Sequence, residues 1–175
     1  MVRSVPAAAF IGMLALSPHA AANAAPIAPA VASPAAQGEA LIVKPLTLQR
    51  IADMDFAILA VTTGGTATID PITGGMSVAG GVIHIGGTPS PARFAGAASK
   101  QSVVNIRIPK VPVLIRRVGG TETLSVSAFT LDGQDKKVLA QQQAFTFAVG
   151  ATITVPAGAV DGVYEGEFDV TVQYP

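Results

Sequence analysis

Apolar and polar residues alternate along the last part of the chain almost without a break. From Tyr164 to Tyr174 the even-numbered positions are apolar, small or aromatic, whereas the odd-numbered positions are Glu, Asp, Thr or Gln. Because successive side chains of a β-strand point to opposite faces, this pattern predicts one continuous strand over 163–174 with one buried face. We expect its aromatic side chains to belong to the core and its acidic side chains to face solvent.

Short β-branched runs separated by turn signals occupy most of the chain from Leu41 onward. The predicted strands are 46–50, 55–61, 66–70, 76–79, 82–85, 103–108, 113–118, 123–130, 144–149, 152–155 and 163–174. Glycine pairs at 64–65, 74–75, 80–81, 86–87 and 119–120 are expected to form turns, because glycine adopts positive φ at low cost. Asp132 and Gly133 suit a hairpin between Thr130 and Lys137.

This succession of short strands predicts the fold class. No segment after residue 24 has the i, i+3, i+4 spacing of an amphipathic helix. Many short strands with glycine turns predict an all-β protein, and we favour an immunoglobulin-like antiparallel β-sandwich. We expect residues 41–175 to form that single domain.

The first residues have the features of an export signal. Arg3 precedes an apolar run from Val5 to Leu16, and small residues follow as far as Ala24. The run is shorter than the roughly 20 residues that span a bilayer, so we predict a signal peptide over 1–24 rather than an anchor. The protein is then exported to the periplasm, the cell surface or the medium, and no membrane span is expected after cleavage.

Residues 25–40 differ in composition from the rest of the chain, because they include three prolines and only one charged residue. Prolines at this density disfavour regular structure and predict an extended, flexible Ala/Pro-rich arm. The arm is either a spacer or a segment that becomes ordered when it binds.

The composition excludes several kinds of chemistry. The chain has no Cys, so disulfides, thiol catalysis and cysteine metal sites are all excluded. With 11 basic and 11 acidic residues it lacks the basic excess typical of nucleic-acid binding, and no nucleic-acid partner is predicted. It has no Trp, which leaves little material for stacking on a sugar.

The sequence supplies no convincing catalytic set. His84 is the only histidine after residue 24, and no Gly-x-Ser-x-Gly sequence provides a nucleophile for a triad. Asp53 and Asp55 share one face of a strand, where two carboxylates could act as acid and base, but we favour solvated carboxylates at a strand edge. We therefore predict that the protein is not an enzyme and has no catalytic residue.

The loop that contains Asp132, Gln134 and Asp135 offers oxygen atoms to a cation. It lacks the regular acidic spacing and the final Glu of an EF-hand, so a plain turn is the favoured interpretation. No metal site and no cofactor site is predicted.

Charge is distributed unevenly along the chain. No acidic residue occurs between Asp70 and Glu122, where the basic residues are Arg93, Lys100, Arg107, Lys110, Arg116 and Arg117. The acidic residues near the C-terminus are Asp161, Glu165, Glu167 and Asp169. We expect the last strand to pair beside a basic strand of the same domain. The alternative is head-to-tail packing, in which a basic patch of one copy meets the acidic strand of the next.

Three groups of segments together resemble a known family. They are Met-Asp-Phe-Ala at 54–57, the pair 91–96 and 104–109, and the C-terminal block of 149–155, 162–168 and 170–174. They resemble the secreted bacterial DUF4402 domain, whose function is not established, with Ala57 standing where that family usually has Gly. The resemblance covers 46–174 and implies an exported β-sandwich.

The C-terminal block, with Gly-x-Tyr and a terminal Tyr, is also similar to chaperone-usher pilin and spore-coat-U-like subunits. That resemblance implies polymerisation, in which an N-terminal strand is donated to the incomplete sandwich of a neighbour. A pilin-type disulfide is impossible here because the chain has no Cys.

These observations favour a non-enzymatic exported structural protein, a pilin-like or surface-fibre subunit that assembles by strand addition. Its expected partners are further copies or related surface subunits and a periplasmic chaperone. The predicted subunit-contact residues are Leu41, Val43, Leu46, Leu48, Tyr164, Phe168, Val170, Val172 and Tyr174.

Two alternatives remain open. The segment 41–48 could be the first strand of its own domain, and Pro45 weakens the donor interpretation because proline cannot donate to a ladder. The protein could also be a secreted or periplasmic module that binds a small molecule or a polysaccharide.

Overall fold

The structure, a computed structural model, describes residues 38–40, 42–141 and 143–175. These residues form strands and no helix, so the described part contains no helix that could cross a membrane. By its internal contacts the chain divides into two units, Met1–Ala40 and Leu41–Pro175. The predicted signal peptide and nearly all of the predicted arm lie outside the described residues.

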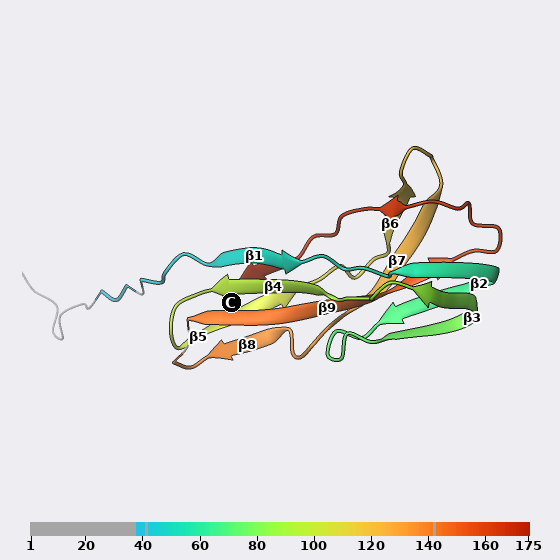
Figure 1. The fold of residues 1–175 in the computed structure, drawn as a ribbon. Helices are drawn as coiled ribbons and strands as arrows, with labels where there is room; N and C mark the ends of the chain where they lie inside the picture. Colours follow the sequence, from blue (N-terminus) through green and yellow to red (C-terminus); the bar gives the residue numbers. More distant parts are fainter. Residues whose placement is uncertain (1–37, 41, 142) are drawn as a thin grey trace, which may run out of the picture. The chain divides into compact units, whose positions relative to one another are not determined.

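The second unit holds all the strands that the structure describes, and they form two antiparallel sheets (Figure 1). The strands are β1 (Thr47–Ala52), β2 (Ile58–Ile69), β3 (Met76–Gly86), β4 (Ala92–Ala97), β5 (Ser102–Arg107), β6 (Val113–Arg117), β7 (Thr123–Leu131), β8 (Lys136–Leu139), β9 (Ala144–Val155), β10 (Tyr164–Glu165) and β11 (Thr171–Gln173). The larger sheet has the order β1-β4-β9-β7-β6-β10, with β2 paired to both β9 and β3. The smaller sheet has the order β11-β5-β8. The prediction of an all-β antiparallel sandwich is confirmed.

Strand β9 organises the larger sheet. Along one side it pairs with β4 over its first half and with β2 over its second half, while β7 pairs along the other side. Gly150 lies where the partner of β9 changes from β4 to β2. A Cβ atom at this position would collide with the carbonyl oxygen of Ile69 and lie 2.7 Å from Cδ of Pro71. The predicted break between 149 and 152 is therefore wrong, because the glycine makes room for β2 to leave while β9 continues.

The first of two hydrophobic clusters lies where β4 and β9 face β5 and β8. Its buried members are Ala92, Phe94, Ala98, Val104, Ile106, Leu139, Phe145, Phe147 and Val149. The rings of Phe94 and Phe147 stack with centroids 5.2 Å apart and an angle of 16° between their planes. We name this set core 1, and it joins the two sheets.

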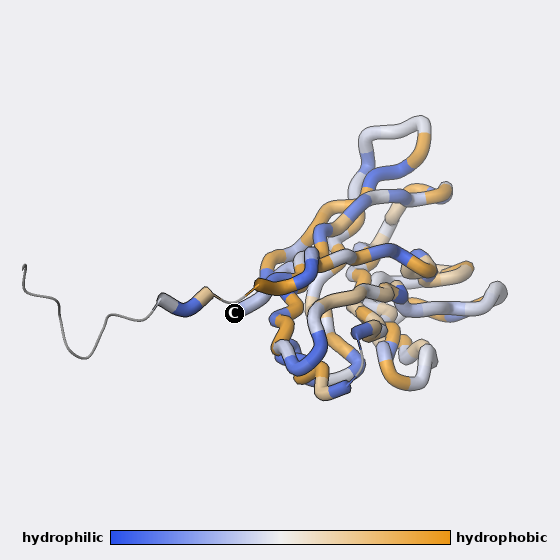
Figure 2. The backbone as a smooth tube through the Cα atoms, turned by 90° about the vertical axis from the view of Figure 1, so that its left-hand side faces the viewer, coloured by the Kyte–Doolittle hydropathy of each residue, from blue (hydrophilic) through white to orange (hydrophobic). Residues whose placement is uncertain are grey.

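The second cluster lies within the curl of the larger sheet. Its buried members, named core 2, are Ala67, Val82, Leu124, Val126, Ala151, Ile153 and Val155. They come from β2, β3, β7 and β9, so the larger sheet bends far enough to cover its own inner face. Hydrophobic and hydrophilic residues alternate along the backbone in Figure 2, as a two-faced sheet requires.

Two glycine pairs do not form the turns that the sequence predicts. Gly64 and Gly80 have positive φ, 79° and 73°, but they lie side by side within the β2–β3 ladder. The four predicted strands of this region are therefore two long ones with a shared irregularity between them. A glycine that can break a strand can also bend it, and the local sequence does not distinguish the two.

The expected hairpin between Thr130 and Lys137 is also wrong. Strand β7 pairs with β6 and β9, whereas β8 pairs with β5 in the other sheet, so residues 132–135 carry the chain between sheets. Strands β4 and β8 were not predicted. Strand β4 reads Ala-Arg-Phe-Ala-Gly-Ala, and its Gly96 leaves the space that the ring of Phe145 occupies.

The continuous last strand is a further correction. Strand β10 pairs with β6 in the larger sheet and β11 pairs with β5 in the smaller one, while residues 166–170 cross between them. The alternation of burial survives the break, because Phe168, Val170, Val172 and Tyr174 all pack against core 1. The predicted faces are therefore correct although the strand is not continuous.

Candidate functional site

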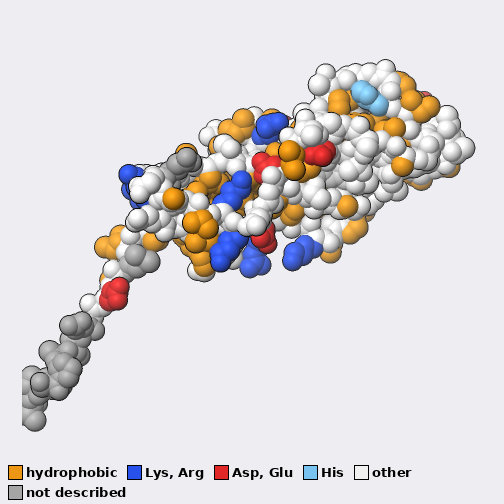
Figure 3. Space-filling view, turned by 90° about the horizontal axis from the view of Figure 1, so that it is seen from below, with side chains coloured by type: hydrophobic (Ala, Val, Ile, Leu, Met, Phe, Trp, Pro, Cys, Tyr) orange, Lys and Arg blue, Asp and Glu red, His pale blue; other side chains and the backbone are white. Residues whose placement is uncertain are grey.

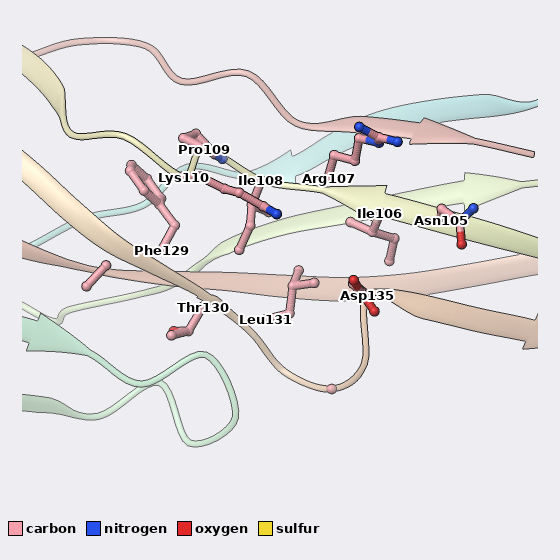
Figure 4. Close-up of a pocket in the computed structure, with 12 residues that line it drawn as sticks. Asn105, Ile106, Arg107, Ile108, Pro109, Lys110, Phe129, Thr130, Leu131 and Asp135 are labelled. Carbon is pink, nitrogen blue, oxygen red and sulfur yellow. The ribbon is translucent and has the colours of Figure 1, made fainter. Parts of the chain in front are cut away.

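An open groove of about 810 Å³ lies between β5 and β7 (Figure 4). One wall is the end of β5 and the residues after it, 105–110, and the other is the end of β7, 128–131. Figure 4 shows Ile108 and Phe129 directed into the space between these two segments. Both are half-buried and pack against the core, so they give the groove an apolar floor.

A bulge in β7 shapes this groove. Ala128 has a φ of 48°, and the register of β7 against β9 shifts between Ser127 and Thr130. Inward-facing positions are even-numbered before the bulge, at Leu124 and Val126, and odd-numbered after it. A single extra residue moves the following side chains to the other face of a strand. The bulge thereby turns Phe129 inward.

Strand pairing of both sheets ends at the groove. On one edge β7 pairs with β6 only as far as Val126, and β9 occupies its other edge. Strand β5 pairs with β8 as far as Asn105, after which the amide of Ile106 donates to the carbonyl of Asp135 at 2.6 Å. In the described part of the chain, residues 108–110 belong to no strand ladder. Apart from the amide that Pro109 lacks, the main-chain groups at these positions pair with no described strand and can accept an extended segment.

Charged side chains border the groove. Arg107, Lys110 and Asp135 are exposed at its rim. Nearby, Nζ of Lys137 donates to the carbonyl of Thr146 at 2.9 Å and lies 3.8 Å from Oδ1 of Asp132. Within 38–40, 42–141 and 143–175 no three His, Asp or Glu side chains gather closely enough to hold a metal ion. The groove is thus apolar at its floor and mainly basic at its rim.

The predicted subunit-contact residues are brought together in the domain's own core. Those that pack against core 1 are Leu46, Leu48, Phe168, Val170, Val172 and Tyr174, and Tyr164 packs against core 2. Leu48 lies in β1, which pairs with β4 of the same chain, as the own-strand alternative describes. Val43 has an exposed fraction of 43%, and Leu41 lies outside the described residues.

The aspartate pair near the start of β2 has structural partners. The carboxylate of Asp53 lies 2.7 Å from Nη1 of Arg50, with both side chains exposed. Oδ1 of Asp55 accepts a hydrogen bond from the amide of Ala57 at 2.7 Å, and its main chain bridges to Ser90. These partners agree with the interpretation of strand-edge carboxylates. His84 is exposed on β3, in a register position opposite Leu59.

The acidic end of the chain does pair beside basic strands of the same domain. Glu165 in β10 stands opposite Arg116 in β6, and Thr171 in β11 stands opposite Arg107 in β5. The close ion pairs of the described residues are Arg50–Asp53, Arg117–Glu122 and Lys137–Asp132. The expected strand pairing is confirmed, although no close ion pair joins these acidic and basic strands.

Glu122 is a carboxyl group with a close basic partner. Nε of Arg117 donates to its Oε2 at 2.7 Å across the turn between β6 and β7. This hydrogen bond lowers the pKa of Glu122 to about 2. The same bond raises the pKa of Arg117. The pair closes the β6–β7 hairpin rather than serving the groove.

Sequence reasoning missed the groove, although one signal of it is present. The inward-facing residues of β7 change from even positions at Leu124 and Val126 to odd positions at Phe129 and Leu131. Such a change of parity within one strand indicates a bulge. The free edges beside the bulge have no local signal, because they depend on where β6 and β8 end.

Comparison with known proteins gives one match. A family model described as a domain of unknown function, DUF4402, matches residues 46–174. No curated protein and no solved structure matches the chain. The matched region begins one residue before β1 and ends one residue after β11, and so covers every strand of the sandwich. The chain therefore belongs to the DUF4402 family, whose function is unknown.

Proposed function

We propose that the protein is a non-enzymatic, exported structural subunit that assembles at the cell surface by strand addition. The observation that carries the proposal is the groove between β5 and β7, where an apolar floor lies beside main-chain edges that no described strand covers. An extended segment can pair with such an edge through its main chain and insert alternate side chains into the floor. The export signal and the Ala/Pro-rich arm predicted over 1–24 and 25–40 support the same function.

The groove receives a segment of a neighbouring subunit, and the contacts within the domain limit which segment that is. Leu46 and Leu48 are already packed against core 1, so donating them would cost the subunit part of its own core. Val43 is exposed and remains free for a contact with a neighbour. The donated segment therefore lies before Lys44, whose main chain is held by hydrogen bonds within the domain, and it includes the arm. Related surface subunits and a periplasmic chaperone are the further partners of this proposal.

The test uses the protein recovered from the surface of its own cells, observed by negative-stain microscopy and light scattering. Lys110→Trp places a bulky side chain at the groove rim, where Lys110 is exposed and its replacement leaves the core intact. Lys100→Trp, at an exposed lysine in the turn before β5, is the matched control. We expect elongated assemblies from the wild type and the control, and no elongated assemblies from Lys110→Trp or from a deletion of 25–40.

Two outcomes would overturn the proposal. Uniform monomers of the wild type at the cell surface would exclude a fibre subunit. A specific glycan or small molecule retained by the wild type and lost from Lys110→Trp would instead favour a secreted or periplasmic binding module. The groove has a single aromatic side chain, Phe129, in its lining.

A further inference from the structure

Strand β3 forms a long free edge of the larger sheet. It has 11 residues, pairs with β2 along one side, and has no partner on its other side in the part of the chain that the structure describes. At about 3.4 Å per residue such an edge extends for roughly 37 Å. Its main-chain donors and acceptors form a template for one more strand.

The outer face of the β2–β3 hairpin next to this edge is apolar. Ile58, Ile83 and Ile85 have exposed fractions of 57%, 51% and 63%. Ile83 stands opposite Ala60 in the ladder, whereas the neighbouring Val82 points inward and is buried in core 2. The three isoleucines thus share the face of the hairpin that is turned away from the core, and we name them the β3 patch.

This hairpin lacks three of the usual protections of a free edge, although two register shifts interrupt its ladder. Natural proteins discourage pairing with charged side chains, proline or very short edge strands. Strand β1 carries Arg50, β8 carries Lys136 and Lys137, and β10 and β11 have only two and three residues. Strand β3 contains no Asp, Glu, Lys, Arg or Pro. In the whole stretch 58–87, Asp70 is the one Asp, Glu, Lys or Arg residue. His84 of β3 is the one histidine among the described residues, and Figure 3 shows hydrophobic side chains around it.

We infer that β3 pairs edge to edge with β3 of a second copy of this chain. Two identical strands related by a two-fold axis run antiparallel, which is the direction of every ladder in this fold. An isologous contact brings each surface against itself, so a charged edge repels its own copy whereas an uncharged one does not. The β3 patch of each copy then lies beside that of the other, and its isoleucines form apolar cross-strand contacts. This contact is distinct from the groove and does not depend on it.

The test compares two double variants by analytical ultracentrifugation of the full chain purified from cells that express it. Both are made in the Lys110→Trp background, which blocks the groove and isolates the β3 contact. Ile83→Lys/Ile85→Lys places like charges on the proposed interface. Val118→Lys/Val138→Lys is the matched control, since these valines have exposed fractions of 56% and 72% on other strands or turns.

The expected results separate this contact from assembly through the groove. Lys110→Trp alone and the valine control remain dimeric at micromolar concentration, whereas the isoleucine variant dissociates about tenfold or more readily because lysines face lysines. Dimers that persist unchanged in the isoleucine variant would overturn the inference, as would a monomeric Lys110→Trp protein. If Lys110→Trp loses the fibres, the result supports assembly through the groove. If the same protein keeps its dimers, the result supports the β3 contact.

Hydrogen exchange provides a second readout that does not depend on how well the isoleucine double variant folds. In the Lys110→Trp protein, amides of Met76–Gly86 exchange more slowly at high protein concentration than at low concentration, while those of Lys136–Leu139 do not change. Equal exchange of Met76–Gly86 at both concentrations would contradict the β3 contact.

Discussion

The hydroxyl group of Tyr174 donates a hydrogen bond to the carbonyl oxygen of Lys44 at 2.8 Å and so joins the two ends of the sandwich. The same hydroxyl accepts a hydrogen bond from the amide of Ser99 at 2.9 Å, and Oγ of Ser99 accepts one from the amide of Lys44. One phenol group therefore ties the segment before β1, the turn after β4 and the end of the chain together.

We predict that Tyr174→Phe lowers the free energy of unfolding by about 1–2 kcal/mol, because the amide of Ser99 loses its partner in a part-buried position. Urea denaturation measures this loss. Tyr164→Phe is the control, since its hydroxyl makes one bond, to the carbonyl of Val160 at 2.7 Å, and we expect a smaller loss. Equal losses in both variants would mean that the three-way junction adds nothing.

Ala57 is strained because its φ is 57°, in the left-handed region. Left-handed backbone costs a residue with a Cβ roughly 1–2 kcal/mol, and glycine loses about 0.5–1 kcal/mol through its greater freedom when unfolded. We predict that Ala57→Gly stabilises the domain by up to about 1 kcal/mol in thermal unfolding. The control is Ala60→Gly, within regular β2, which should destabilise the domain. If the Ala57→Gly protein were less stable than the wild type, this account would be refuted.

Gly150 allows β9 to pass the point where β2 leaves the sheet. A methyl group there would collide with the carbonyl of Ile69 and with the ring of Pro71, and neither can move without shifting a strand. We predict that Gly150→Ala costs about 2–3 kcal/mol, at the upper end of typical overpacking. Gly133→Ala is the control in denaturant unfolding, because nothing lies within 4 Å of its added Cβ. A neutral Gly150→Ala would show that the crossing adjusts easily.

The Arg117–Glu122 pair predicts a pH dependence. Because the native pKa of Glu122 is about 2 and its ordinary value is 4.5, the native state favours the ionised carboxylate. The stabilisation from this group is present above about pH 4.5 and is lost as the pH falls toward 2. We predict that an NMR titration gives a Glu122 midpoint near 2, and that Arg117→Met moves it toward 4.5. A midpoint that Arg117→Met leaves unchanged would exclude this cause.

The last segment shows which features the sequence predicts and which it does not. Alternation from Tyr164 to Tyr174 predicts correctly which side chains turn toward the core, because burial of alternate side chains is a local property of extended chain. It does not predict the crossing over 166–170, since extended residues alternate whether or not a neighbouring strand pairs with them. The break follows from the positions of β6 and β5, to which the two parts attach.

The groove illustrates the opposite case. The change of parity at Ala128 is visible in the sequence, but the free edges beside it exist only because β6 and β8 stop where they do. Those ends depend on residues far away in the chain. A candidate site made of uncovered main chain therefore has no motif for sequence reasoning to find.

By itself, the sequence determined the all-β class, the family and the inward and outward faces of the last segment, because alternation and turn chemistry act between near neighbours. Only the tertiary structure decided that Gly64 and Gly80 bend strands, that β8 joins the smaller sheet, and that no other described strand pairs with the outer edge of β3. The physical reason is that a strand chooses its partner through main-chain hydrogen bonds and a shared core. Both are contributed by segments distant in sequence, and main-chain groups are the same in every residue except proline.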